Sequence, residues 1–153
     1  MGSMDNPPSY DELFPATESE QTMTTLTKMP SKYLEDLSSA PPNHATYFTR
    51  TVSWGADTGY YRGEMDYKGR RSGSGTMIWT PSEVSDVHLK DVKRAYSGHW
   101  SRDLMSGSGD MWWGDTGTRY SGQWAEGLMN GHGSIRFGDN TSQPGHVYSG
   151  QFR

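Results

Sequence analysis

The sequence predicts an all-β protein made of repeated antiparallel β-hairpins, preceded by a long N-terminal tail. Three observations support this class. The chain has 19 glycines, only 31% hydrophobic residues and 12% aromatic residues. A pattern of Tyr-x-Gly-x-aromatic followed by Gly-x-Gly recurs along residues 44–153. Within each recurrence, apolar or small residues alternate with polar ones, which is the period of a strand with one buried face.

Composition sets limits on the function classes. The chain has 153 residues, enough for one domain, and a mean hydropathy of −0.87. It has no cysteine, so disulfides, thiolate metal sites and a cysteine nucleophile are excluded. No apolar run approaches the roughly 18 residues of a membrane span, and no secretion signal is visible. We therefore expect a cytoplasmic protein, at the membrane periphery if it binds lipid.

Residues 1–43 are expected to form a mostly disordered acidic tail. They carry seven acidic and two basic residues, a net charge of −5, whereas residues 44–153 carry eleven and twelve, a net charge of +1. They also hold six of the eight prolines and no tryptophan. One stretch has helical spacing after a candidate N-cap at Ser31, with apolar residues three or four apart: Leu26, Met29, Tyr33 and Leu37. An acidic tail on a near-neutral body does not suggest nucleic-acid binding.

Residues 44–153 are expected to form the repeat domain. Three complete units and two partial ones are found: 61–79, 96–113 and 120–137, with partial units at 46–54 and 148–153. The units "YSGHWSRDLMSGSGDMWW" and "YSGQWAEGLMNGHGSIRF" start 24 residues apart, and the first complete unit has one extra residue. Residues 46–54 are predicted to be the second strand of an incomplete unit. The longer spacer between Trp79 and Tyr96 is either a lengthened hairpin or a loop with a helical turn.

The glycines are expected to have two uses. Residues 125–128 form a predicted tight turn in which Gly127 has a positive φ angle, and Asp103 occupies the same position one unit earlier. Gly107 and Gly109 are predicted to be sockets that let aromatic rings from neighbouring strands lie flat.

The alternation places the large rings on one face of the sheet. These residues are Tyr61, Trp79, Tyr96, Trp100, Trp113, Tyr120, Trp124, Phe137 and Tyr148. Most are expected to pack as core against glycines. If no second layer covers this face, part of it stays open as a groove, and an exposed apolar patch marks an interaction site. Trp112 points to the other face and is expected to contact the tail, a partner or solvent.

These residues resemble MORN repeats, whose motif is close to Tyr-x-Gly-x-Trp-x-x-Gly-x-x-x-Gly-x-Gly. The unit from Tyr120 to Gly133 matches every position, whereas the preceding unit has Asp103 for glycine and the first has Met65 for tryptophan. The resemblance implies a single-layer, elongated, twisted antiparallel sheet with an aromatic-rich groove. It also implies a scaffold that binds peptides or helices of partner proteins, and, for some members, membranes and phosphoinositides.

No residue pattern indicates catalysis, a cofactor or a metal. The five histidines lack metal-ligand spacing, and the Gly-x-Gly pairs lack the lysine and helix start of a phosphate-binding loop. We therefore expect a non-enzymatic scaffold or adaptor that binds a protein helix or peptide in the groove. The strand at 148–152 is also a candidate edge for a homodimer, because an unpaired edge invites strand addition.

Three alternatives remain open. The first is a phosphoinositide or membrane-surface module that uses the only two cation clusters: Lys68, Arg70 and Arg71, and Lys90, Lys93 and Arg94. The second is a regulatory repeat segment of a larger enzyme. The third is a viral structural or budding protein.

The tail contains a PPxY motif, the ligand that WW domains bind. Pro7 and Pro8 favour polyproline II geometry, and Tyr10 fills a neighbouring pocket in such complexes. The sequence therefore predicts a WW-domain partner for the tail.

Overall fold

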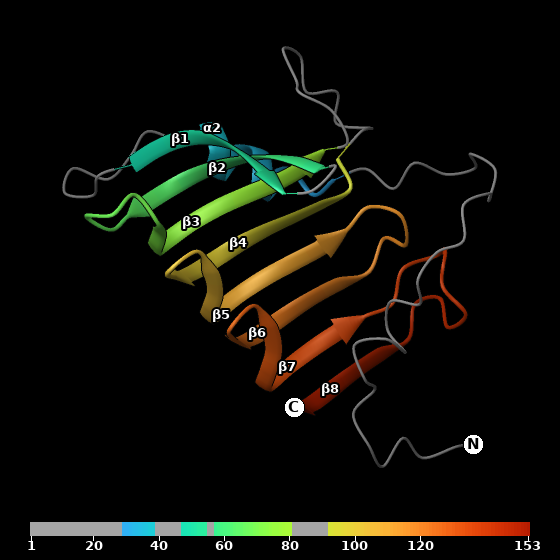
Figure 1. Cartoon of the computed structure of the whole chain (residues 1–153). Coiled ribbons are helices and arrows are strands. Elements are labelled where there is room, and N and C mark those ends of the chain that lie inside the picture. Colours follow the sequence, from blue (N-terminus) through green and yellow to red (C-terminus); the bar gives the residue numbers. More distant parts are fainter. Residues whose placement is uncertain (1–28, 39–46, 55–56, 81–91) are drawn as a thin grey trace.

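The computed structural model describes residues 29–38, 47–54, 57–80 and 92–153. Within these residues the chain forms one helix and eight strands: α2 (Ser31–Ser38), β1 (Tyr47–Trp54), β2 (Asp57–Met65), β3 (Arg71–Thr80), β4 (Arg94–Ser101), β5 (Leu104–Trp113), β6 (Arg119–Ala125), β7 (Leu128–Arg136) and β8 (Val147–Phe152). All eight strands form one sheet in chain order, and every neighbouring pair is antiparallel (Figure 1). The predicted fold class, an open sheet of consecutive hairpins, is confirmed.

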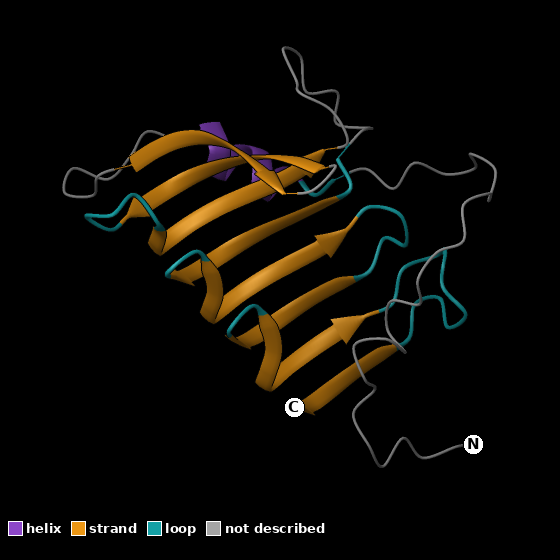
Figure 2. Cartoon of the chain, viewed as in Figure 1, coloured by secondary structure: helices purple, strands orange, loops and turns teal. Residues whose placement is uncertain are grey.

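The helix lies against one side of the sheet, and within the described residues no second layer of strands covers the other side (Figure 2). We call the side that carries α2 the helix face and the opposite side the ring face. β1 pairs with β2 along its whole length, as predicted for the second strand of an incomplete unit. The spacer residues 81–91 and the tail residues 1–28, with the PPxY motif, lie outside the described residues.

A row of seven glycines crosses the sheet and sets its register. Each pairs directly with the next: Gly63, Gly75, Gly98, Gly109, Gly122, Gly133 and Gly150. A Cβ atom on Gly109 would overlap the ring of Tyr96, because that ring lies flat on the backbone of the row. The prediction that Gly109 is a socket for a ring is confirmed.

Gly107 has a different structural role from Gly109. The prediction that Gly107 is a socket for a ring was wrong. An added Cβ would have the Cβ of His99 as its nearest neighbour, at 3.4 Å, and no tyrosine ring lies against it. Its φ is +65°, and it lies where the β4–β5 register shifts between Gly98 and Trp100. Glycine is needed here because the irregular backbone takes a left-handed conformation. The equivalent glycines of the other units have the same left-handed conformation: Gly73 at φ +73° and Gly131 at φ +69°.

The hairpin tips match the predicted turn chemistry. Glu126 and Gly127 connect β6 to β7 with φ angles of 52° and 83°. Arg102 and Asp103 connect β4 to β5 with φ angles of 49° and 71°. Two central residues with positive φ form the type of turn whose twist suits a two-residue hairpin.

Candidate functional site

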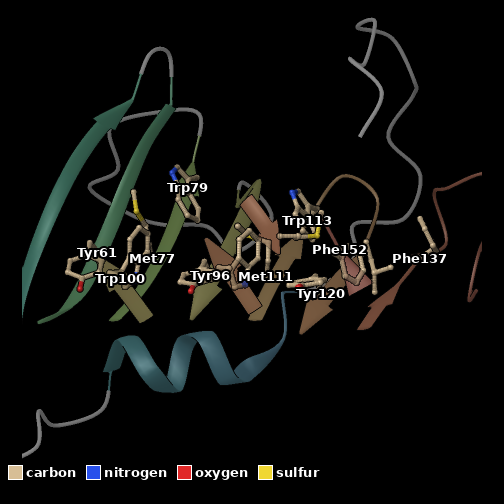
Figure 3. Packing of buried hydrophobic residues seen from close by; sticks show 13 residues of the cluster. Tyr61, Met77, Trp79, Tyr96, Trp100, Met111, Trp113, Tyr120, Phe137 and Phe152 are labelled. Atoms are coloured by element: carbon tan, nitrogen blue, oxygen red, sulfur yellow. The ribbon is translucent and has the colours of Figure 1, made fainter. Parts of the chain in front are cut away.

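Seven aromatic rings form a continuous row across the ring face. In order they are Tyr61, Trp100, Tyr96, Trp124, Tyr120, Phe152 and Tyr148. Adjacent ring centroids are 5.0–5.5 Å apart and every contact is edge-to-face. Figure 3 labels five rings of the row: Tyr61, Trp100, Tyr96, Tyr120 and Phe152. Edge-to-face contact satisfies the quadrupoles of the rings. The rings therefore bury one another, and the sheet needs no second layer to form a core.

The polar atoms of the row are used inside the sheet. Each tyrosine hydroxyl donates to the carbonyl oxygen three residues later, at 2.8–3.1 Å: Tyr61 to Glu64, Tyr96 to His99, Tyr120 to Gln123 and Tyr148 to Gln151. The indole Nε1 groups donate to glycine carbonyls of the preceding unit: Trp100 to Gly75 at 3.0 Å and Trp124 to Gly109 at 3.2 Å. The repeated tyrosine and tryptophan thus close each hairpin and join it to its neighbour.

All nine aromatic residues proposed from the sequence to line a groove lie on the ring face. Eight of them are buried, and only Tyr148 is partly exposed. Because most of these rings are core, other side chains form much of the accessible surface of this face, together with parts of Trp79 and Trp100.

The accessible part is a hollow at the β4–β5 end of the ring face, with a volume of about 390 Å³. Its walls are largely apolar: Trp79, Trp100, Leu104, Met105 and Met111. Its charged lining residues are Arg71, Arg94, Asp103 and Glu126. We call it the ring-face hollow. Leu104 is 39% exposed there and was not singled out from the sequence, although a leucine recurs at the same position of the next unit, Leu128.

Arg71 is an internal residue of this face. It is only 3% exposed, and its guanidinium lies 4.4 Å from the centroid of the Trp100 ring. Its backbone N and Nε both donate to Oδ1 of Asp103, at 2.9 and 3.1 Å, and Nη2 donates to the Asp103 carbonyl at 2.9 Å. The departure of Asp103 from the glycine of the motif is explained by this contact between units.

The cations proposed as a lipid contact do not form one exposed cluster. Arg71 is buried, which contradicts its proposed role in binding lipid. Arg70 forms an ion pair with Asp66 at 2.7 Å and holds the pKa of that carboxyl below its ordinary value. Lys68 and Lys93 are exposed, and Arg94 lies 4.7 Å from the Trp79 ring centroid on the ring face. Lys90 lies outside the described residues.

Trp112 lies on the helix face, as the alternation predicts, and contacts the tail helix. It is buried in a cluster with side chains of α2 and β3, of β4, and of the residues just before α2 and β4: Met29, Tyr33, Ile78, Val92 and Ala95. Of the three sequence alternatives for Trp112, the tail is the one observed. Burial raises the pKa of the Tyr33 hydroxyl well above its ordinary value.

Two polar contacts hold α2 on the sheet. Lys32 donates to Oδ2 of Asp110 at 2.6 Å. Asp36 accepts from the hydroxyls of Ser97 at 2.8 Å and Thr76 at 3.3 Å. The helix is thus docked by a small apolar cluster and a few charged contacts.

A sequence profile of the MORN repeat family matches residues 61–82, 96–118 and 120–142. These stretches begin at Tyr61, Tyr96 and Tyr120, the tyrosines that close the three complete hairpins. The chain is a MORN-repeat protein. MORN repeats are commonly protein-interaction or membrane-binding modules, and the family is generally non-enzymatic. A search of curated proteins found no match to this MORN protein.

Two further observations concern the described part of this MORN protein. Among the described residues, no group of three or more His, Asp or Glu side chains is placed to hold a metal ion. The helix in that part is too short and too polar to cross a membrane.

Proposed function

We propose that this MORN protein is a non-enzymatic interaction scaffold whose ring-face hollow takes up side chains of a protein partner. The observation that carries the proposal is the hollow itself, an open cavity of about 390 Å³ with largely apolar walls. A site of this size accepts the one or two anchor side chains that dominate many protein interfaces. Met105 and Met111 in its walls adapt readily to different anchors.

The polar groups of the hollow favour a partner with an acidic or carbonyl group beside its apolar anchor. Within the described residues, Arg94 stacks on Trp79 and makes no ion pair. The indole Nε1 of Trp79 is buried and has no hydrogen-bond acceptor there. A guanidinium with no carboxylate partner pairs strongly with a carboxylate once water is excluded.

Site-specific photo-crosslinking in living cells tests this function. A benzophenone amino acid at Leu104, on the hollow, should crosslink to a discrete protein, whereas the same group at Asp139, on an exposed loop, should not. Leu104→Asp should weaken binding of the purified partner at least about tenfold, because a carboxylate would replace an apolar contact. Crosslinks that go only to lipid, or equally from both positions, would contradict a protein partner.

The membrane alternative has less support, because Arg71 is internal and Arg70 is paired with Asp66. Vesicle flotation decides between the two. We expect no flotation with vesicles that contain phosphoinositides at physiological salt. Flotation that is lost in the double variant Lys68→Glu, Lys93→Glu would favour the membrane module instead.

We also propose that the PPxY motif binds a WW domain, which would make the protein an adaptor. Titration of a WW-domain panel against the full chain should give binding that Tyr10→Ala removes and Tyr33→Phe leaves unchanged. Equal affinity for the wild type and Tyr10→Ala would exclude the motif. A cytoplasmic location, proposed from the absence of cysteine, would be contradicted by finding the tagged protein in the secretory lumen.

A further inference from the structure

One cross-strand row on the helix face changes its chemistry where α2 no longer covers it. The row runs through direct pairs in the order Tyr60, Ile78, Ala95, Trp112, Arg119, Arg136 and Val147. Its first four members belong to the apolar cluster beneath α2. The next two are exposed arginines. The face is therefore apolar where the helix lies and cationic immediately beyond it.

Arg119 and Arg136 are directly opposite each other on β6 and β7. Like charges in this arrangement destabilise a sheet. Within the described residues, neither side chain forms an ion pair that would offset this repulsion. Two adjacent guanidinium groups suit an anionic ligand, because each can donate two parallel hydrogen bonds to a carboxylate or phosphate.

The neighbouring row adds hydroxyl donors to the same place. Ser121 and Ser134 are also directly paired, and they line one hollow of about 310 Å³ with both arginines. Pro30, Lys32, Tyr33 and Asp110 line the same hollow. Asp110 is the one carboxylate among these lining residues, and Lys32 holds it at 2.6 Å. We call this hollow the twin-arginine site. The charges of Lys32 and Asp110 balance each other, so Arg119 and Arg136 give its lining a net charge of +2.

We propose that the twin-arginine site binds the acidic segment of the chain's own tail, residues 11–20. This segment, "DELFPATESE", has four carboxylates and no basic residue. Its point of attachment is beside the site, since Pro30 forms part of the wall. Nine positions separate Glu20 from Met29, and an extended chain of that length spans roughly 30 Å.

Because the acidic segment is attached to the site through the chain, a weak attraction between its carboxylates and the arginines is sufficient for binding. A short flexible linker holds its end group at an effective concentration in the mM range. Carboxylates that bind exposed arginines only weakly in free solution therefore occupy the site when they are attached. The interaction is electrostatic, so added salt should weaken it.

Paramagnetic relaxation in the full-length chain tests the proposal. The chain has no cysteine, so Ala16→Cys gives a single site for a nitroxide label. At low salt the amides of Ser121, Ser134 and Arg136 should fall to about half their intensity or less, since tethering keeps the segment near them. This loss of intensity is paramagnetic broadening, and the double variant Arg119→Gln, Arg136→Gln should remove it. The double variant Glu18→Gln, Glu20→Gln should also remove it, and so should salt near 0.5 M added to the wild type.

The control variant is Arg102→Gln, which removes an exposed arginine at the β4–β5 tip and should leave the broadening unchanged. The double arginine variant should remain folded, because it removes a repulsive pair. Broadening that is absent, uniform along the helix face or unaffected by the arginine variants would overturn the proposal. The proposal would also be overturned if labelled chains broadened the amide signals of unlabelled chains in a mixture, because this would show that the segment binds a second copy.

Discussion

Asp103 stands at a hairpin position where the next unit has Gly127, and it has the left-handed backbone that glycine favours. Its carboxylate and carbonyl accept three hydrogen bonds from Arg71, whose guanidinium is buried against Trp100. The strained backbone at this residue is offset by the pairing of a buried cation. Replacing Asp103 by glycine would bring this unit closer to the family motif, but it would remove the contact with Arg71 of the preceding unit.

Asp103→Gly is expected to lower the free energy of unfolding by about 1–3 kcal/mol, because the buried Arg71 would lose its charged partner. Relief of the positive φ offsets at most about 1 kcal/mol of this loss. Urea unfolding measures the difference. Adding Arg71→Met to Asp103→Gly should recover part of the loss. A single variant as stable as the wild type would show that the contact contributes nothing.

The buried tyrosines predict alkaline unfolding. Burial raises the pKa of Tyr120 to about 12, whereas an unfolded tyrosine titrates near pH 10. The unfolded chain therefore loses this proton first, so the free energy of unfolding should be constant below about pH 10 and fall between pH 10 and 12. The expected slope for this residue is at most about 1.4 kcal/mol per pH unit. Urea unfolding of Tyr120→Phe should give a shallower decline, and equal slopes for the two proteins would contradict the assignment.

At the scale of the strand, β8 has a phenylalanine where the two preceding units have a tryptophan. Phe152 lies between Tyr120 and Tyr148. In the same way, Trp100 and Trp124 each lie between the tyrosine of the preceding unit and the tyrosine of their own unit. Unlike those indoles, a phenylalanine ring cannot donate to the glycine carbonyl of the preceding unit. The ring contact is kept in β8 but the hydrogen bond is absent.

Phe152→Trp is expected to raise the free energy of unfolding by about 1 kcal/mol, because the new Nε1 can donate to the carbonyl of Gly133. The matched variant Trp124→Phe should lower it by a similar amount or more, because it also removes part of a buried ring. Chemical unfolding of both variants checks the pair. Loss of stability in Phe152→Trp would show that the last unit has no room for the indole.

At the scale of the molecule, stability is local and repetitive. Each of the eight described strands pairs only with its neighbours in sequence within that part of the chain. Each ring of the row contacts rings of its own unit or of the adjacent one. In such an array the unfolding free energy is close to a sum of unit and interface contributions. The number of units can therefore change without loss of the fold.

Deletion of residues 120–147 is expected to give a shorter folded sheet. It joins Arg119 to Tyr148, so that Gly150 would face Gly109 and Phe152 would face Gly107, as Gly122 and Trp124 do now. The urea dependence of the unfolding free energy should fall, because less surface is buried. An out-of-phase deletion of the same length, residues 108–135, should not fold, because it breaks the pairing of β5. Circular dichroism and urea unfolding distinguish the two.

Much of the architecture could be predicted because the repeat is local. The alternation at Tyr96, Gly98 and Trp100 indicated one face, and the turns at Asp103 and Gly127 follow from residues next to each other in sequence. Gly107 was assigned wrongly because only the register shift shows that it serves irregular backbone. The Arg71 contact was missed because its partner Asp103 lies 32 residues away.

The fold class, the repeat units and the face on which the rings lie follow from the amino-acid order alone, because each depends on period-two alternation and on turns within one hairpin. The three-dimensional packing shows that the rings bury one another and leave the ring-face hollow accessible beside them. It also shows that α2 covers Trp112 and that Arg119 meets Arg136 beside it. These outcomes depend on strand register and on packing between distant segments, and no local pattern in the chain specifies them.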